Sequence, residues 1–331
     1  MVRSLPASSV AAWCFFSLPS ALIFPVEAHA NTRTAATVAA TTAVEPTAAE
    51  QPIPDEPVGQ LPPYSPPSNP DVVNAIQNWF RAIGEVRTGE TFGELTARAA
   101  ASRLGTGYDS SAQDDGPEVL RIQIGTLNCV SLIEYADAIA RCIWSKTPTP
   151  ACFLTEVEAS RYRSGQRAGY ASRLHYFTEW IDDNERRGRF SPVHELPHHE
   201  LRRPFFFMSK HRGLYPALYN PDILNSVRET EHELSAKTHT FVTRDAIEHA
   251  QQHLRSGDVV AIVSTTPGLL ITHTGLIRLD EQGRPRLLHA SRQNGRVVLS
   301  RKDIADYVIR ANTRRGVIVT RPEPPVVNAS D

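Results

Sequence analysis

The chain has 331 residues, with 35 lysines and arginines against 36 aspartates and glutamates, and its formal net charge is −1. This balance argues against the strongly basic surface that a nucleic-acid partner requires, and it gives no support for binding to an acidic membrane. Hydrophobic residues make up 41% of the chain and charged residues 21%, as in globular proteins, so the chain can hold one large domain or two smaller ones.

Residues 1–30 have the pattern of a secretory signal peptide. A basic start at Arg3 precedes an apolar run over residues 10–24, and Ala28–Ala30 has the Ala-x-Ala form of a cleavage site. A membrane anchor is the less favoured alternative, because the run is short for a bilayer and contains proline. A lipoprotein signal would need a small residue in place of Trp13. We therefore expect export to the periplasm or the extracellular space, with no integral membrane segment after cleavage.

Residues 31–70 are predicted to be a disordered linker. The chain contains 25 prolines, 12 of which lie in its first 70 residues, and the segment is rich in alanine and threonine. It has no apolar periodicity, so it cannot bury enough surface to offset the entropy of ordering. It either spaces the rest of the chain from an anchoring point or has no further role.

Residues 71–325 are predicted to form a single α+β domain. The apolar spacing predicts helices at 71–83 (with Asp71 as N-cap), 92–104, 129–144, 152–162, 171–187, 222–234 and 243–254. It predicts strands at 258–263, 272–279, 286–290, 295–299 and 315–320, with Ser300 and Asp303 as a capping box before a helix at 301–309. Helices followed by strands favour α+β over alternating βαβ units.

The four cysteines are too few for a disulfide scaffold. Cleavage of the signal peptide removes Cys14. A helical hairpin would bring Cys142 close to Cys152, so these two could pair. Cys129 begins the same helix as Cys142, about 20 Å away at 1.5 Å per residue, which is too far for a disulfide. Cys129 is therefore expected to be unpaired, at a helix start that favours thiolate; the alternative is a buried structural cysteine.

Two histidines occupy consecutive predicted strands. Pairing His273 with His289 in an antiparallel hairpin centres the turn on residue 281, inside the turn sequence Asp280–Gly283. Directly opposed residues would have Cβ atoms about 5 Å apart. One imidazole could then take a thiol proton while the other orients it. The alternative is a pair of structural polar residues on a sheet face.

Three other histidines lie in a polar, proline-containing loop, at positions 194, 198 and 199. No cysteine and no helical spacing supports a metal site there, and no glycine-rich phosphate loop occurs. We expect neither a metal nor a cofactor.

These motifs, taken in order, resemble the NlpC/p60 superfamily of papain-like cell-wall cysteine hydrolases. The residues that carry the resemblance are Cys129 at a helix start, His-Thr-Gly-Leu-Ile at 273–277, Leu-Leu-His-Ala-Ser at 287–291, Gly-Thr-Gly-Tyr at 105–108 and Ser-Gly-Asp-Val-Val at 256–260. Further blocks at 161–165, 170–176, 180–184 and 207–211 resemble its N-acetylmuramoyl-L-alanine amidase-like branch. The likeness covers about residues 95–320.

The resemblance implies a papain-like fold, with a helical N-terminal half and the nucleophile at a helix start packed on an antiparallel sheet. Cys129 would be the nucleophile, His273 the general base and then acid, and His289 the orienting group. Tyr108 would line the cleft, and the Cys129 backbone N–H would donate to the oxyanion. The substrate would be peptidoglycan or a muropeptide, cleaved between N-acetylmuramic acid and L-alanine through an acyl-enzyme.

Further substrate contacts are expected from the branch-specific blocks and from the residues beside the nucleophile. The candidates are Asn128, Ser131, Arg163, Arg173, His175, Tyr176 and His211. Each could instead be a surface ion pair, a packed aromatic or a helix cap. Many superfamily members have aspartate at the position of Asn128, where it can bind a free amine of the stem peptide.

Two alternatives remain open. One is a γ-D-glutamyl–diamino-acid endopeptidase of the same fold, which the loss of aspartate at position 128 makes less favourable. The other is a non-catalytic module that binds the cell wall. The sequence makes no prediction about oligomeric state.

Overall fold

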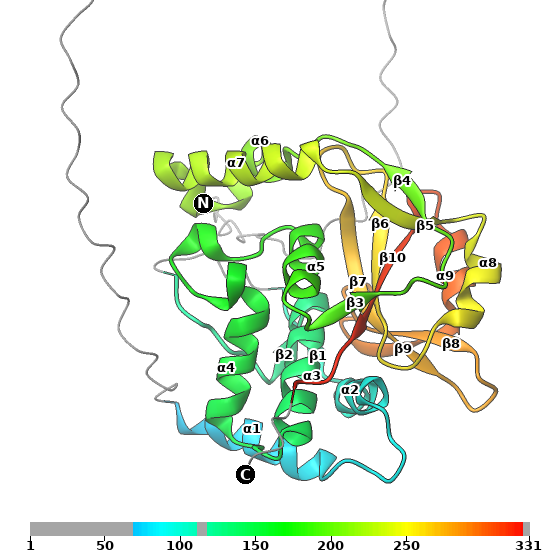
Figure 1. Cartoon of the computed structure of the whole chain (residues 1–331). Coiled ribbons are helices and arrows are strands. Elements are labelled where there is room, and N and C mark those ends of the chain that lie inside the picture. The colour runs from blue at the N-terminus through cyan, green and yellow to red at the C-terminus, as the bar shows by residue number, and fades with distance from the viewer. Residues whose placement is uncertain (1–68, 111–117, 327–331) are drawn as a thin grey trace, which may run out of the picture. The chain divides into compact units, whose positions relative to one another are not determined.

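The computed structural model describes residues 69–110 and 118–326, which form a mixed α+β structure around one large sheet (Figure 1). The predicted signal peptide and nearly all of the predicted linker lie outside the described residues. In the part of the chain that is described, no helix is long and apolar enough to cross a membrane.

The secondary-structure elements follow one another from a helical first half to a strand-rich second half. The helices are α1 (Pro70–Ile83), α2 (Phe92–Ala101), α3 (Cys129–Trp144), α4 (Pro150–Arg161), α5 (Phe177–Arg186), α6 (Phe207–Lys210), α7 (Pro221–Ala236), α8 (Ile247–Ala250) and α9 (Ile304–Ile309). The strands are β1 (Gly107–Tyr108), β2 (Thr126–Leu127), β3 (Phe190–Pro192), β4 (His199–Leu201), β5 (His239–Thr243), β6 (Val259–Ser264), β7 (Ile271–Leu279), β8 (Pro285–Ser291), β9 (Arg296–Asp303) and β10 (Arg314–Pro322).

The strands are arranged in the order β2-β1-β9-β8-β7-β6-β10-β5-β4, and β3 also pairs with β10. Among the described strands, β1 and β2 pair in parallel and the other pairs are antiparallel. Helices α1 to α5 lie on one side of the sheet, and α8 and α9 lie on the other (Figure 1). Because both faces are covered, every residue of β6 is buried.

Helix α3 is enclosed by the sheet and the other helices. It packs against α2, α4, β7 and β8, and nearly all of its residues are buried. Its polar residues are therefore paired within the protein. Glu134 accepts from Arg161 of α4 at 2.7 Å, and the completely buried Asp137 accepts from Arg141 and from Arg189 at 2.9 Å each.

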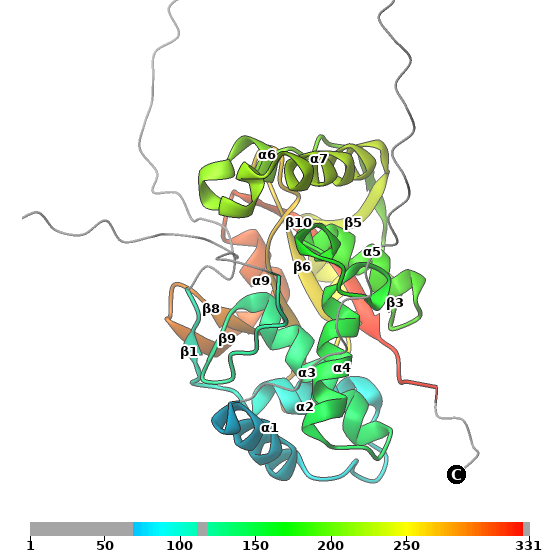
Figure 2. The ribbon, with the colours of Figure 1, turned by 90° about the vertical axis from the view of Figure 1, so that its left-hand side faces the viewer.

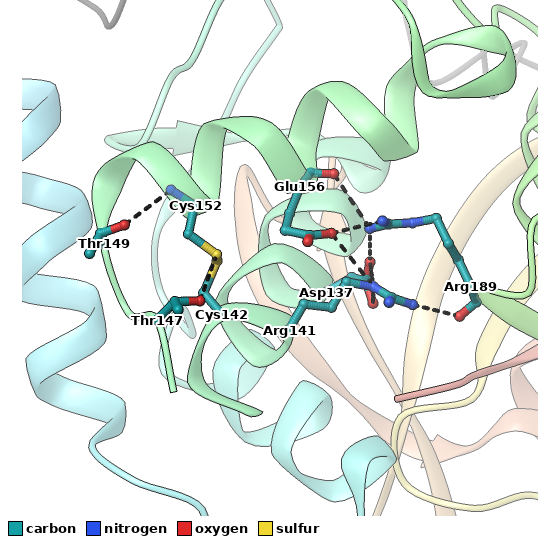
Figure 3. The surroundings of a disulfide bond; sticks show 8 residues. All are labelled: Asp137, Arg141, Cys142, Thr147, Thr149, Cys152, Glu156 and Arg189. Carbon is teal, nitrogen blue, oxygen red and sulfur yellow. Dashed lines mark hydrogen bonds and ion pairs between the residues drawn. A yellow bond between two sulfur atoms is a disulfide. The ribbon is translucent and has the colours of Figure 1, made fainter. Parts of the chain in front are cut away.

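The Asp137 cluster connects α3 to Glu156 of α4 and to Arg189, just before β3 (Figure 3). Arg141 donates to the backbone oxygens of Arg189, at 2.8 Å, and Glu323, at 2.9 Å, and Arg189 also donates to Glu156 of α4 at 2.7 Å. Removing one member would leave a buried charge without its partner, which is strongly destabilising.

Cys142 and Cys152, which the sequence allowed to pair without requiring it, form a disulfide between α3 and α4 (Figure 3). Their Cα atoms are 6.0 Å apart and their sequence separation is 10 residues. Thr149 caps α4 by accepting from the Cys152 backbone N–H at 3.1 Å. The bond closes the α3–α4 hairpin at the end away from Cys129.

Two glycines allow α2 to approach the turn before β6. Gly257 has a φ of +96°, and a Cβ built there would lie 2.2 Å from the carbonyl oxygen of Gly93. The next residue, Asp258, is completely buried and accepts from Arg321 at 2.8 Å and from the backbone N–H of Arg255 at 2.8 Å. The Ser-Gly-Asp sequence at 256–258 thus serves close packing and a buried ion pair.

Several sequence-based expectations need correction. The first helix is capped by Asn69, whose side chain accepts from the Asp71 backbone N–H at 2.9 Å, and not by Asp71. The predicted helix 243–254 is only partly helical: Thr243 ends β5, a turn follows at 244–246, and the helical part is the short α8 followed by a 3-10 turn at 251–253. Ser300 belongs to β9 and forms no capping box; Asp303 alone caps α9.

Replacing both Cys142 and Cys152 by alanine is expected to lower the free energy of unfolding by about 2–3 kcal/mol, the entropy of a loop of this length. Urea titration of the oxidised and the variant proteins measures the difference. An unchanged midpoint at unchanged slope would contradict a stabilising role for the bond.

The variant Gly257→Ala is expected to lower the free energy of unfolding by about 2–3 kcal/mol, because it adds a contact with the Gly93 backbone to the strain of a positive φ. The matched control is Gly188→Ala, where φ is +68° and a Cβ would meet nothing within 4 Å. The control should lose about 1 kcal/mol. Thermal and urea unfolding measure both losses. Equal losses would show that the contact with the Gly93 backbone adds no destabilisation.

Candidate active site

Cys129 is the first residue of α3, and the adjacent residues cap the helix. The Asn128 side-chain oxygen accepts from the backbone N–H groups of Val130, at 3.1 Å, and Ser131, at 2.9 Å. The Ser131 hydroxyl accepts in return from the Asn128 backbone N–H at 2.9 Å. This reciprocal cap fixes the N-terminal turn and leaves the Cys129 N–H outside the bonds of the Asn128 side chain.

The expectation that Cys129 is unpaired is wrong for this structure, in which Cys129 is disulfide-bonded. The expectation counted cysteines after removal of residues 1–30, which takes away Cys14 and leaves three. The full chain has four cysteines, an even number. Cys14 lies outside the described residues. Cys129 is also buried, with 2% of its surface exposed.

Tyr108 lies beside the start of α3. In the parallel pair of β1 and β2, Tyr108 is opposite Leu127, and the chain continues from Leu127 through the cap into the helix. Burial and, to a lesser degree, Asp109 raise the pKa of Tyr108 to about 12 despite the opposing charge of Arg292. The tyrosine is therefore a neutral hydroxyl at neutral pH. Figure 2 shows β1 alongside β9 and β8.

The two predicted histidines are in direct contact. His273 Nε2 lies 2.7 Å from His289 Nδ1, and the two rings meet edge to face with centroids 4.8 Å apart. His289 is buried and His273 partly buried. Since α3 packs against both β7 and β8, the structure brings the helix that begins with Cys129 onto the two strands that carry the histidines.

The predicted hairpin register is wrong by two residues. The strands pair Leu276 with Leu288 and Ile277 with Leu287, so His273 and His289 are diagonal neighbours rather than directly opposed. The turn is two residues longer than expected, because Leu279 pairs with Pro285 rather than with residue 283; within it, Asp280 accepts from the Arg284 backbone N–H at 2.9 Å. The shift of His289's partner from residue 273 to 275 is two residues, so both histidines stay on one face.

Gly275 makes this diagonal contact possible. A Cβ built there would lie 2.8 Å from the Leu288 carbonyl oxygen and 2.9 Å from the His289 Cβ. The glycine of the His-Thr-Gly sequence therefore leaves room for His289, and the preceding threonine is fixed by its hydroxyl bond to the Val260 carbonyl at 2.9 Å.

Both imidazoles are neutral at neutral pH. Burial lowers the pKa of His289 to about 4, and the positive charge of Arg314 contributes to the decrease. Burial also lowers the pKa of His273 well below its usual value, with further contributions from His289 and Arg314.

Sequence analysis missed two residues next to the histidine pair. The ring of Tyr307 from α9 meets that of His289 edge to face, with centroids 5.5 Å apart, and Arg314 from β10 stacks on Tyr307. Tyr307 lay within the predicted helix 301–309, and Arg314 lay just before the predicted strand 315–320. A pairing of α9 and β10 beside β8 is a tertiary contact that no local pattern contains.

The branch-specific candidates make contacts within the protein. Arg163 bonds Glu179 at 2.9 Å through Nε, and Arg173 bonds Glu118 at 3.0 Å through Nε. Asn128 and Ser131 form the cap described above. Substrate contact by these residues stays a prediction.

The three aromatic candidates likewise bond to neighbouring residues. The Tyr176 hydroxyl donates to Glu231 at 2.7 Å. A ring nitrogen of His175 lies 2.9 Å from the Tyr170 carbonyl oxygen, and one of His211 lies 2.7 Å from that of Phe207. Their predicted contacts with substrate also stay predictions.

Within residues 69–110 and 118–326, no group of three or more histidine, cysteine, aspartate or glutamate residues is arranged to hold a metal ion. The neutral imidazoles of the histidine pair can exchange protons and form hydrogen bonds.

Comparison with known proteins places the chain in a family. A model of the AmiA-like family, described as N-acetylmuramoyl-L-alanine amidase-like, matches residues 99–317, which include Cys129, His273 and His289. The chain belongs to this N-acetylmuramoyl-L-alanine amidase-like family. No curated protein matches it.

Solved structures agree with the family. An N-acetylmuramoyl-L-alanine amidase from Bacteroides uniformis is 28% identical with a TM-score of 0.66, over 70% of this chain and 99% of that one. A structure from Bacteroides fragilis named a putative xylanase is 29% identical with a TM-score of 0.63, over 69% and 99%. A Legionella pneumophila protein shares the fold at 16% identity and a TM-score of 0.57, over 77% and 96%.

The low pKa of His289 predicts a pH-dependent loss of stability. In the unfolded chain a histidine with a pKa of about 6.5 binds a proton at pH values where the folded His289 stays neutral. The free energy of unfolding therefore falls as pH decreases from about 6.5 towards 4. Between pH 7.5 and 5 this one group accounts for about 2 kcal/mol. Urea unfolding of wild type and His289→Asn at both pH values isolates it, because the variant should lack that part of the loss. Equal losses in both proteins would contradict the prediction.

Proposed function

We propose that this protein is a cell-wall hydrolase that cleaves the amide between N-acetylmuramic acid and L-alanine, with Cys129 as nucleophile. The observation that carries the proposal is the 2.7 Å contact between His273 and His289 on the strands against which the Cys129 helix packs. The family and the Bacteroides uniformis amidase support the choice of bond. We also propose the NlpC/p60 papain-like superfamily for its fold.

In the proposed mechanism, His273 accepts the Cys129 thiol proton through Nδ1 while its Nε2 is held by His289. The thiolate attacks the lactyl carbonyl carbon of N-acetylmuramic acid. The backbone N–H of Cys129, which the Asn128 cap does not use, donates to the oxyanion, an interaction often worth several kcal/mol. Tyr108, beside the start of the helix, lines the cleft.

Breakdown of the tetrahedral intermediate breaks the carbon–nitrogen bond, and His273 gives its proton to the departing amine of L-alanine. A thioester remains on Cys129. Water then attacks the thioester with His273 as base, which releases the muramic acid carboxylate and restores the thiol.

The active form requires Cys129 as a thiol, whereas the structure has it disulfide-bonded. We propose that residues 1–30 are removed during export before Cys129 is oxidised, so that the mature chain has Cys129 as a thiol while Cys142 and Cys152 form their bond. The α3–α4 disulfide supports an exported protein, because such bonds persist in oxidising compartments such as the periplasm. Counting thiols in the protein that starts at residue 31 would give one per chain.

The name of the Bacteroides fragilis structure points to a glycoside hydrolase, which is a less suitable function for this site. Most such enzymes place two carboxylates on either side of the scissile bond. In the described part of this chain, the charge that acts on both histidines is the cation of Arg314. A neutral imidazole pair on the strands that pack against the helix of Cys129 suits acyl transfer.

Replacing Cys129 by alanine in the chain that starts at residue 31 is expected to abolish release of the stem peptide. Defined muropeptides are incubated with wild type and variant, and the products are weighed by mass spectrometry. The amidase gives a sugar-free peptide that begins with L-alanine. A γ-D-glutamyl–diamino-acid endopeptidase would instead leave an L-alanyl-D-glutamate stub on the sugar.

Three outcomes would overturn the amidase proposal: no cleavage by wild type, equal cleavage by Cys129→Ala, or the endopeptidase product. Alkylation of Cys129 no faster than that of a model peptide, together with absent cleavage, would favour a non-catalytic cell-wall binding module. Circular dichroism of the variant controls for its folding.

A further inference from the structure

A continuous stack of side chains leads from β10 through α9 to the histidine pair. The guanidinium carbon of Arg314 lies 3.9 Å from the centre of the Tyr307 ring, a cation–π distance, and its Nη1 donates to the Tyr307 backbone oxygen. The Tyr307 ring meets the His289 ring at 72° with centroids 5.5 Å apart. His289 then bonds His273 at 2.7 Å.

The stack restricts the orientation of His289. A histidine ring has a broad torsional preference about its last side-chain bond, so rotation could remove Nδ1 from His273. The Tyr307 ring occupies one side of His289, and Arg314 holds Tyr307 through two contacts, to its ring and to its backbone. We propose that Tyr307 and Arg314 are positioning residues that hold His289 with Nδ1 as a neutral hydrogen-bond acceptor for His273.

The protonation of His289 decides which nitrogen of His273 can act as base. A neutral His289 that accepts at Nδ1 lets His273 keep its proton on Nε2, so Nδ1 has the lone pair that a thiol proton needs. A protonated His289 would donate at Nδ1 and force His273 to accept there. The proton of neutral His273 would then sit on Nδ1, and the base would be lost.

The cation of Arg314 opposes protonation of both imidazoles, in addition to their burial. The described side chains that contact the His289 ring have no cationic charge at neutral pH: they are His273 on β7 and neutral Tyr307 on α9. Opposite His289 on β9 lies the apolar Val298. Arg314 is thus the charge through which this part of the fold acts on the pair.

The kinetic test of this inference rests on the proposed function. The spectroscopic test depends only on the histidines. The variants are Arg314→Gln, Tyr307→Ala and the conservative Tyr307→Phe, each in the chain that starts at residue 31. Arg315→Gln is the matched control, because it removes the same charge from the neighbouring position, where the side chain is exposed.

Nitrogen-15 NMR of the imidazoles between pH 3 and 8 reports the pKa and tautomer of each histidine. Arg314→Gln should raise the pKa of His289, while Arg315→Gln and Tyr307→Phe should leave it near that of wild type. Tyr307→Ala should broaden or shift the Nδ1 signal of His289. Equal His289 pKa values in Arg314→Gln and Arg315→Gln would overturn the electrostatic part of the proposal.

On a defined muropeptide, kcat should fall about tenfold or more in Arg314→Gln and Tyr307→Ala with KM within about twofold, since lost general-base chemistry affects the reaction and not binding. Tyr307→Phe should retain wild-type kcat. Wild-type kcat in folded Arg314→Gln would overturn the positioning role. If Tyr307→Ala fails to fold, Arg314→Gln alone decides. Full activity of Cys129→Ala would refute the proposed function and leave the NMR result standing.

Discussion

The burial of α3 on every side is the constraint on which the rest of the structure depends. A helix enclosed by a sheet and by other helices cannot leave a charge unpaired, so Glu134 and Asp137 each require an arginine from elsewhere in the fold. Those arginines come from α4 and from the segment before β3, and the disulfide adds a covalent link to α4. The position of Cys129 follows, because it is the first residue of a helix that cannot move independently.

The candidate site consequently lies on rigid elements rather than on loops. The cap of Asn128 and Ser131 fixes the first turn of α3, and the hairpin of β7 and β8 fixes both imidazoles. Gly275 permits the diagonal approach of the rings, and the stack of Tyr307 and Arg314 supports them from the other side. Such support from packed neighbours is what keeps a proton-transfer geometry constant.

Much of this arrangement is predictable from local sequence. The apolar period predicted α3 with its observed bounds, and a turn sequence between two strands placed both histidines on one face. The register error arose because turn residues show where a hairpin turns but not how many residues the turn contains. Tyr307 and Arg314 could not be found, because their role depends on which elements meet in space. The pairing state of Cys129 was predicted from a count of cysteines, and a count does not show which sulfur atoms meet in space.

The hydrogen bonds of Glu323 set a lower limit on the extent of the folding unit at its C-terminal side. The family match ends at residue 317, but Glu323 supplies a carbonyl to Arg141 at 2.9 Å and a carboxylate to Ser191 at 2.5 Å, and its N–H donates to Arg189 at 2.9 Å. A fragment cut at the family boundary would lose these partners together with the end of β10. It would leave the Arg141 guanidinium of α3 without one of its acceptors, so the cooperative unit extends beyond the residues that the family model matches.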